Sequence, residues 1–137
     1  MPELPEVEIT VRRLERALAG AEVESALAPG MKVMRTFEPP LESLAGRRIS
    51  AIRRIGKMPV VEFGDRALLI HLMSAGRLGV FEKRASPRDR ASRVLVRLTE
   101  GRELRLREFG TRQRAWAKLL GTDEVAQDEM VATLGPE

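Results

Sequence analysis

Apolar residues recur every three or four positions near the start of the chain. One stripe at helical spacing is formed by Leu4, Val7, Val11, Leu14 and Leu18. Pro5 would lie in the first helical turn, where its missing N–H costs nothing. Gly20 is suited to end a helix. The pattern therefore predicts an amphipathic helix over residues 4–19.

After Gly20 the pattern changes to short segments separated by Gly, Pro and charged residues. We expect strands near residues 22–28, 32–37, 48–55, 60–63, 67–72, 77–82, 92–98, 102–107 and 113–119. The clearest hairpin covers residues 92–107, with Glu100 and Gly101 as its turn. Such a series predicts a mainly β domain, a two-layer antiparallel β-sandwich flanked by α-helices, with the first helix packed against it.

The 137-residue length suits one domain with its own core. Residues 83–91 are basic and are expected to form a mobile loop. The acidic stretch 121–137 predicts a short helix followed by a linker that starts at residue 134. We therefore expect a domain over residues 1–133 and a linker start over residues 134–137.

The composition excludes several kinds of metal site. The chain has no cysteine and one histidine, His71, which excludes cysteine-ligated zinc and a multi-histidine metal site within it. We expect no cofactor in this chain. No apolar run approaches the ~20 residues of a membrane span, and the N-terminus does not have the order of a signal peptide. These features are compatible with the cytoplasm, and we expect a monomer that does not bind membranes.

The net charge is +4, but its distribution is more informative than its size. Acids gather in the first helix and the C-terminal tail, whereas arginines crowd the middle and residues 102–114. A basic middle predicts a phosphate-rich partner, most simply nucleic acid. The low aromatic content, 4%, argues against a stacking platform for single strands.

The N-terminal residues suggest amine catalysis. When Met1 is removed, Pro2 becomes a free secondary amine with Glu3 beside it. An α-amino group has a pKa of about 8, so a useful fraction is unprotonated near neutral pH. Attack on a sugar C1′ would give a positively charged iminium without a metal, and Glu3 could supply the proton.

The string PELPEVE at residues 2–8 resembles the start of the formamidopyrimidine-DNA glycosylase and endonuclease VIII family of DNA-repair enzymes. The resemblance implies a base excision repair glycosylase with AP lyase activity, which removes oxidised bases from damaged double-stranded DNA in the nucleoid. It implies a Schiff base on Pro2, with Glu3 as proton donor, and β/δ-elimination. Glu6 is then a second acid of the motif, although a helix-capping acid remains an alternative.

Lys57 follows Arg53-Arg54-Ile55-Gly56 and precedes an apolar strand. This segment resembles the family segment in which a lysine holds a phosphate next to the damaged nucleotide, which places Lys57 in the catalytic set. A long cation beside a glycine also lets a phosphate approach closely. Arg53 is expected on a solvated strand face. Pro59 departs from the family pattern, so the strand should begin after it, lie at an edge or carry a bulge.

Residues 70–78 resemble the family segment H-L-G-M-S-G-x-L. The resemblance implies that His71 contacts a phosphate. The family methionine that fills the gap left by the flipped nucleotide aligns with Ser74. Met73, one position earlier, either takes that role or packs in the core, and the sequence leaves both open.

Residues 107–116 resemble D-P-R-R-F-G-A-W, anchored on Ala115-Trp116. In the family an arginine and a phenylalanine of this loop enter the duplex. Arg112 is the expected arginine, although the register also permits Thr111. Gln113 occupies the phenylalanine position, and it could hydrogen-bond a base but could not wedge a stack. Trp116 is expected in the core.

The resemblance extends from Pro2 to Glu137. Family members continue into a helix–two-turns–helix domain and usually a zinc finger, so this chain resembles an N-terminal catalytic domain that would bind DNA weakly alone. Two alternatives remain: a non-catalytic DNA-binding relative, suggested by Ser74 and Gln113, and a β-sandwich interaction module.

Overall fold

The structure is a computed structural model that describes residues 3–30 and 32–128. It begins with helix α1 (Leu4–Leu18). The strands that follow within the described part are β1 (Val23–Leu27), β2 (Ala51–Ile55), β3 (Met58–Phe63), β4 (Arg66–His71), β5 (Gly76–Phe81), β6 (Ser92–Leu98), β7 (Glu103–Glu108) and β8 (Trp116–Gly121). Short 3₁₀ helices cover Leu41–Leu44 (η1) and Thr122–Gln127 (η2).

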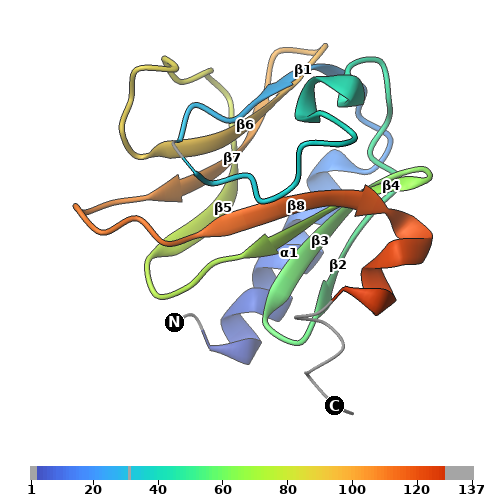
Figure 1. Ribbon diagram of the computed structural model, residues 1–137. Coiled ribbons are helices and arrows are strands. Elements are labelled where there is room, and N and C mark those ends of the chain that lie inside the picture. Colours follow the sequence, from blue (N-terminus) through green and yellow to red (C-terminus); the bar gives the residue numbers. More distant parts are fainter. Residues whose placement is uncertain (1–2, 31, 129–137) are drawn as a thin grey trace.

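The strands form two four-stranded antiparallel sheets, in the orders β1-β6-β7-β5 and β2-β3-β4-β8 (Figure 1). Helix α1 contacts β2 and β3 of one sheet and β5 of the other. Its predicted apolar stripe is buried at Val7, Val11, Leu14 and Leu18. The predicted mainly β sandwich with an N-terminal helix is therefore confirmed.

The core has two parts. The larger cluster lies between the sheets and under α1. A smaller cluster, which we call the Trp116 cluster, contains Met58, Val60, Ala67, Leu69, Trp116 and Val125. It lies on the β3-β4-β8 sheet under η2, because Val125 is the buried residue of η2. Trp116 is buried as predicted, but in this second cluster.

The strand predicted at residues 32–37 is wrong. This segment runs beside β8 through an isolated parallel bridge between Met34 and Ala117. The N–H of Arg35 donates to the Ala117 carbonyl, and the N–H of Ala117 donates to the Val33 carbonyl, both at 2.9 Å. Pro39 and Pro40 follow and have no N–H with which to extend the ladder.

Pro59 is accommodated differently from the prediction. Strand β3 begins at Met58, one residue before the proline, and lies between β2 and β4. Pro59 faces Arg54 near the hairpin turn, whereas the ladder with β4 begins only at Val60. The missing N–H therefore falls outside the ladder that joins β3 to β4.

Other boundaries follow the prediction closely. The β6–β7 hairpin turns at Glu100-Gly101, and η2 supplies the short helix expected after residue 121.

The basic loop 83–91 is anchored, since the N–H of Ala85 donates to Glu103 Oε1 at 3.1 Å. The predicted linker at 134–137 lies outside the described residues. In the described part no helix is long and apolar enough to cross a membrane.

Strand register brings two connecting segments together. His71 is paired with Trp116 in the β4–β8 ladder, and Gly76 is paired with Glu108 in the β5–β7 ladder. Residues 72–75 and 109–115 therefore leave the sheets at the same end of the sandwich. In Figure 1 this end also holds the start of α1 and the β2–β3 turn.

Candidate functional site

The start of α1 carries two carboxylates that face solvent. Glu3 is the N-cap residue in an extended conformation, and its side chain does not cap the helix. Glu3 and Glu6 are both exposed, and neither carboxylate has a hydrogen-bond or ion-pair partner among the described residues. Pro2, the predicted nucleophile, lies outside the described residues.

Two contacts place this helix end. Arg54 of β2 donates to Glu8 Oε1 at 3.1 Å, which ties the first turns of α1 to the β2–β3 hairpin. A small hollow of about 50 Å³ is lined by Glu6, Val7, Thr10, Pro59, Leu72, Arg77 and Leu78. Glu6 therefore lies beside the segment that follows His71.

Lys57 lies in the tight β2–β3 turn. Gly56 before it has φ 59°, a left-handed conformation that glycine adopts without strain. The Lys57 ammonium has no carboxylate partner among the described residues, whereas Arg53 is 3.3 Å from Glu62 Oε2. Lys57 is thus available for an external anion, while Arg53 lies in an ion pair along the sheet.

His71 ends β4, and its ring lies against Trp116 with the centroids 5.2 Å apart. The backbone N–H of Met73 donates to Nδ1 of His71 at 3.1 Å. Burial lowers the pKa of His71, and the nearby charge of Arg35 lowers it further. A neutral imidazole whose Nδ1 accepts a hydrogen bond carries its proton on Nε2, so Nε2 is a donor.

Met73 follows in an unusual conformation, with φ 53°. Its half-buried side chain packs against the Trp116 cluster, which also contains Met58 at the start of β3. Ser74 is exposed. The turn after His71 therefore packs, through Met73, against the cluster that includes Met58 next to the β2–β3 turn, and Ser74 lies at the surface.

The loop over residues 109–115, which we call the β7–β8 loop, is held by a buried carboxylate. Glu108 is 1% exposed and accepts hydrogen bonds from the N–H groups of Arg114 and Ala115 at 3.0 Å. Arg93, 4% exposed, approaches Glu108 Oε1 at 3.5 Å. The start and end of the loop are therefore joined through one buried side chain.

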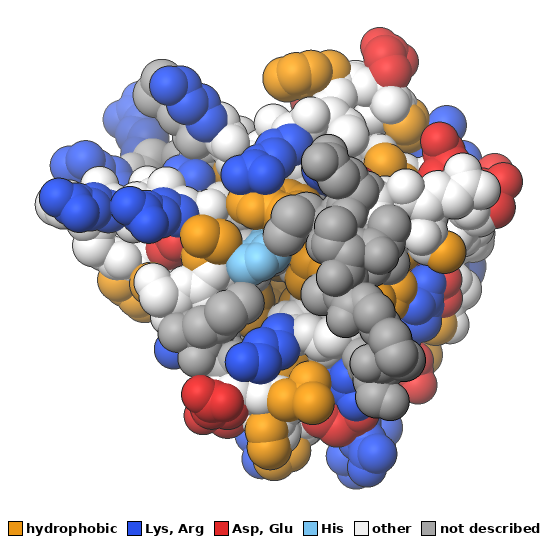
Figure 2. Space-filling view, turned by 60° about the horizontal axis from the view of Figure 1, so that its bottom comes forward, with side chains coloured by type: hydrophobic (Ala, Val, Ile, Leu, Met, Phe, Trp, Pro, Cys, Tyr) orange, Lys and Arg blue, Asp and Glu red, His pale blue; other side chains and the backbone are white. Residues whose placement is uncertain are grey.

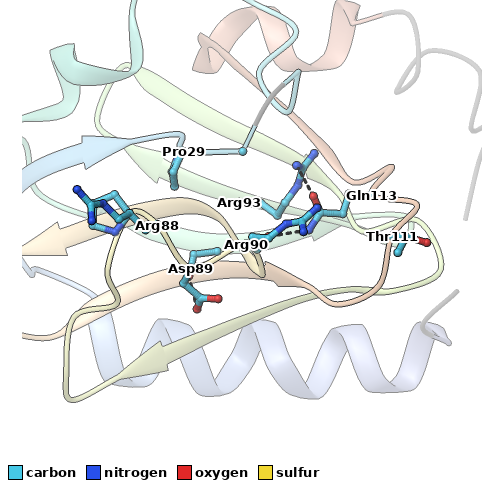
Figure 3. Close-up of a pocket in the computed structure, with 10 residues that line it drawn as sticks. Pro29, Arg88, Asp89, Arg90, Arg93, Thr111 and Gln113 are labelled. Atoms are coloured by element: carbon cyan, nitrogen blue, oxygen red, sulfur yellow. Dashed lines mark hydrogen bonds between the residues drawn. The ribbon is translucent and has the colours of Figure 1, made fainter.

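Gln113 is part of the same network. Its Oε1 accepts from Nη1 of Arg93 at 3.0 Å (Figure 3), and its Nε2 donates to the carbonyls of Arg90 and Glu108 at 2.7 and 2.9 Å. Both ends of the amide are thus engaged within the protein. A direct base contact by Gln113 would require these bonds to break.

These residues border a hollow of about 370 Å³ between three segments, near residues 29–30, 87–93 and 111–113. In Figure 3 Arg93 and Gln113 lie on one side, and the carboxylate of Asp89 points away from them. A Cβ on Gly30 would come within 2.8 Å of Nη1 of Arg93, so this backbone position lets the guanidinium pass closely. The sequence pattern does not single out Arg93 and Glu108, because charged residues in strands usually face solvent.

At the tip of the loop, Thr111 and Arg112 are exposed, and Phe109 is 63% exposed. Many arginines elsewhere are paired with carboxylates, such as Arg47 with Asp65 and Arg84 with Glu24. Cations whose side chains have no such partner among the described residues occur on the segments that meet near His71: Arg35, Lys57, Arg112 and Arg114. In Figure 2 blue side chains lie above, to the left of and below the pale blue histidine.

The described residues contain no group of three His, Asp or Glu side chains that could hold a metal ion. At this end the described residues provide two carboxylates and several cations that have no oppositely charged partner among them, and a histidine whose Nε2–H can donate a hydrogen bond. This combination suits an anionic ligand and proton transfer.

Comparison with known proteins agrees with this geometry. Residues 1–114 match the family model of the formamidopyrimidine-DNA glycosylase N-terminal domain. The formamidopyrimidine-DNA glycosylase of Pelobacter propionicus is 37% identical over all of this chain and half of that protein. The enzyme of Geobacter sulfurreducens is 35% identical over all of this chain and 49% of that protein.

Solved structures give the same result. The Lactococcus lactis formamidopyrimidine-DNA glycosylase, non-covalently bound to DNA containing an AP site, superposes with a TM-score of 0.85 at 29% identity. That match covers 99% of this chain and 52% of the other. The chain thus spans about half the length of the relatives it matches. Sequence and fold together show that the chain belongs to the formamidopyrimidine-DNA glycosylase N-terminal domain family.

Proposed function

We propose that this chain is the catalytic half of a base excision repair DNA glycosylase with AP lyase activity, acting on oxidised bases in duplex DNA. One observation carries the proposal: the start of α1, with Glu3 and Glu6, lies at the same end of the sandwich as His71 and the cations Lys57 and Arg112, and none of these four charged side chains has an oppositely charged partner in the described part of the chain. The Lactococcus lactis relatives are bound to DNA that contains an abasic site or a FAPY-dG.

In the proposed reaction Met1 is removed and the free amine of Pro2 attacks C1′. The bond from C1′ to the base breaks, and Glu3 gives a proton to the leaving base or to the sugar ring oxygen. The attached amine then loses its N–H proton and the C1′–O4′ bond of the sugar ring breaks, with the ring oxygen taking up a proton, which leaves an iminium on C1′. It acidifies C2′, whose proton is lost as the C3′–O bond breaks and releases the 3′ phosphate. A second elimination releases the 5′ phosphate.

The remaining residues hold the DNA in this proposal. A base inside a duplex is out of reach, so the nucleotide must rotate out of the stack. Lys57 and the Nε2–H of His71 bind backbone phosphates next to it. Glu6 is a second carboxylate that contributes to the electrostatics of the pocket. Its position beside Leu72 and Arg77 is consistent with that role.

The exposed loop residues occupy the space left by the flipped nucleotide. Arg112 and Ser74 are exposed at neighbouring turns, so they are the proposed contacts with the duplex interior. Met73 would also contact the duplex interior if its turn rearranged. For Gln113 we propose an indirect contribution to DNA binding, because its amide already binds Arg93 and the backbone of Arg90 and Glu108.

A strand-scission assay tests the activity. The chain, with Met1 removed, is incubated with a duplex that has one abasic site, and the ends of the product strands are identified. We expect a nick flanked by phosphates, as β- and δ-elimination require. A matched variant in which Met1 is retained has an amide at Pro2 and should leave the strand intact. Equal cleavage by both proteins would contradict the proposal.

A second candidate is a non-catalytic DNA-binding relative. The internal engagement of Gln113 and the serine at position 74 favour it, because the loops then lack a wedge for the duplex. It predicts salt-dependent duplex binding with no strand scission, even when the N-terminus of Pro2 is free.

A further inference from the structure

Arg77 and Arg107 lie directly opposite each other on neighbouring strands. They are paired in the β5–β7 ladder, in which β5 is the edge strand of its sheet. Leu78 and Leu106, the next pair, are buried in the core, so the two arginines point to the outer face of the sheet. The side chains of such a pair begin about 5 Å apart, and like charges placed directly opposite destabilise a sheet. This pair of cations would therefore be stabilised by an anion.

Other arginines on the same face are compensated within the protein. Arg97 and Arg105 both donate to the buried carboxylate of Glu103, at 3.1 and 2.8 Å. Arg77 and Arg107, in contrast, have no carboxylate partner in the described part of the chain. The guanidinium of Arg77 donates to two backbone carbonyls of its own turn, which leaves its positive charge in place.

Aromatic rings hold the guanidinium of Arg107. Its Cζ is 4.6 Å from the ring centroid of Phe81 and 5.5 Å from that of Phe109. Gly79 leaves room for the Phe81 ring, since a Cβ at this position would lie 3.3 Å from Cε1 of Phe81. A guanidinium that lies over rings keeps the N–H groups at its edge open for hydrogen bonds. Arg107 is thus positioned for an anion that approaches from solvent.

We propose that Arg77, Arg107 and Phe109 form a docking site for an acidic segment of a partner protein. A carboxylate of that segment bridges the two guanidiniums, because its planar pair of oxygens matches the edge of a guanidinium. An apolar side chain of the segment covers Phe109, which is 63% exposed. Phe109 also lines a hollow of about 330 Å³ near residues 89–91 and 108–111, which can receive that side chain.

Two arguments favour a protein over DNA as the partner. Arginine and aromatic side chains together are typical of the centres of protein interfaces. The backbone of a duplex could supply an anion, but its sugars and phosphates are polar and would leave Phe109 without an apolar partner. The docking site goes beyond the proposed function and does not depend on it.

Titration with an acidic peptide tests the docking site. The probe is a short synthetic peptide in which aspartate alternates with phenylalanine, and its matched control has asparagine in place of aspartate. In nuclear magnetic resonance spectra the acidic peptide should shift the backbone amide signals of residues 76–81 and 103–109 in a saturable way. The asparagine peptide should bind at least about 10-fold more weakly, because it cannot form charge-assisted hydrogen bonds.

Substitutions test whether the two guanidiniums share one carboxylate. Arg107→Ala should weaken binding of the acidic peptide by about 10-fold. Arg77→Ala should also weaken it, and the double variant should bind more tightly than the product of the two single effects predicts. Arg107→Lys keeps the charge but loses the planar fork, so its affinity should fall between those of the unchanged chain and Arg107→Ala.

Arg13→Ala is the matched control, because Arg13 is also exposed and has no partner among the described residues, but lies in the middle of α1. It should leave peptide binding nearly unchanged. Equal losses in Arg13→Ala and Arg107→Ala, equal binding of the two peptides, or absence of a saturable shift in the unchanged chain would overturn the docking site.

Duplex DNA provides the remaining comparison. If Arg107→Ala weakens duplex binding more than Arg13→Ala does but leaves peptide binding unchanged, this face contacts DNA and the docking site is wrong. If the chain binds the acidic peptide through Arg107 but does not cleave a duplex with an abasic site, the proposed function fails and the docking site stands.

Discussion

At the scale of single residues, His71 shows how neighbours decide the state of a side chain. Trp116 covers its ring, and the charge of Arg35 acts on it from nearby. Burial and this charge both lower the pKa of His71, so the imidazole is neutral near neutral pH. The hydrogen bond from Met73 then leaves Nε2 as the donor. A neutral donor suits a phosphate contact that must be released after the reaction.

The lowered pKa of His71 predicts how stability depends on pH. The unfolded chain keeps a histidine pKa of about 6.5, so below that pH it binds more protons than the folded chain. The free energy of unfolding should therefore fall as pH drops through about 6.5 and level off below the folded pKa. Urea unfolding between about pH 8 and pH 5 checks this, with His71→Gln as the control. A difference between the two proteins that does not change with pH, or grows in favour of the unchanged chain on acidification, would contradict it.

At the scale of elements, the β7–β8 loop depends on the end of β7. Glu108 accepts the N–H groups of Arg114 and Ala115 and lies beside Arg93. Gln113 joins Arg93 to the backbone of the loop. The exposed residues Thr111 and Arg112 are thus carried on a loop whose two ends are tied to one buried pair. This support fixes the part of the loop that would meet DNA.

Glu108→Gln should destabilise the protein strongly. It removes the carboxylate charge that lies 3.5 Å from the buried Arg93, a change that costs about 3–5 kcal/mol in other buried pairs. Glu100→Gln makes the same chemical change at the opposite end of β7, in an exposed pair with Arg102, and should cost less than about 1 kcal/mol. Denaturant unfolding of both variants measures the difference, and equal losses would show that the buried pair does not support the loop.

The elements differ in how far the sequence predicts them. The helix and the β6–β7 hairpin were predicted because their periodicity is local. The segment 32–37 was misassigned because its residues resemble a strand, while only tertiary contacts decide that it pairs with β8 at one bridge. Arg93 precedes Val94 like a solvent-facing strand position, and Glu108 is a charged residue on the face of Leu104 and Leu106, so the burial of this pair could not be inferred from residue type. The roles of Pro2, Glu3 and Lys57 came from motif resemblance and stay predictions.

At the scale of the whole molecule, the pairing of charged side chains is more informative than the net charge. The net charge is only +4, and many arginines are neutralised by carboxylates or bound to carbonyls. Around His71 the cations Arg35, Lys57 and Arg112 have no acidic partner in the described part of the chain. A local excess of this kind attracts a polyanion to one end of the sandwich.

The salt dependence of duplex binding should report this arrangement. Each phosphate contact contributes about 0.9 to the slope of log affinity against log salt concentration. Lys57→Ala should therefore reduce the slope by about that amount, whereas Arg13→Ala should leave it unchanged. Fluorescence anisotropy over a series of salt concentrations gives both slopes. Identical slopes in the two variants would mean that Lys57 does not contact a phosphate.

Amine catalysis at Pro2 is the central claim, and covalent trapping tests it most directly. The chain, with removal of Met1 verified by mass, is incubated with a duplex that contains one abasic site, and borohydride is added. We predict a stable protein–DNA adduct whose attachment maps to the nitrogen of Pro2. An adduct on a lysine, or equal trapping by a chain that retains Met1, would contradict the claim.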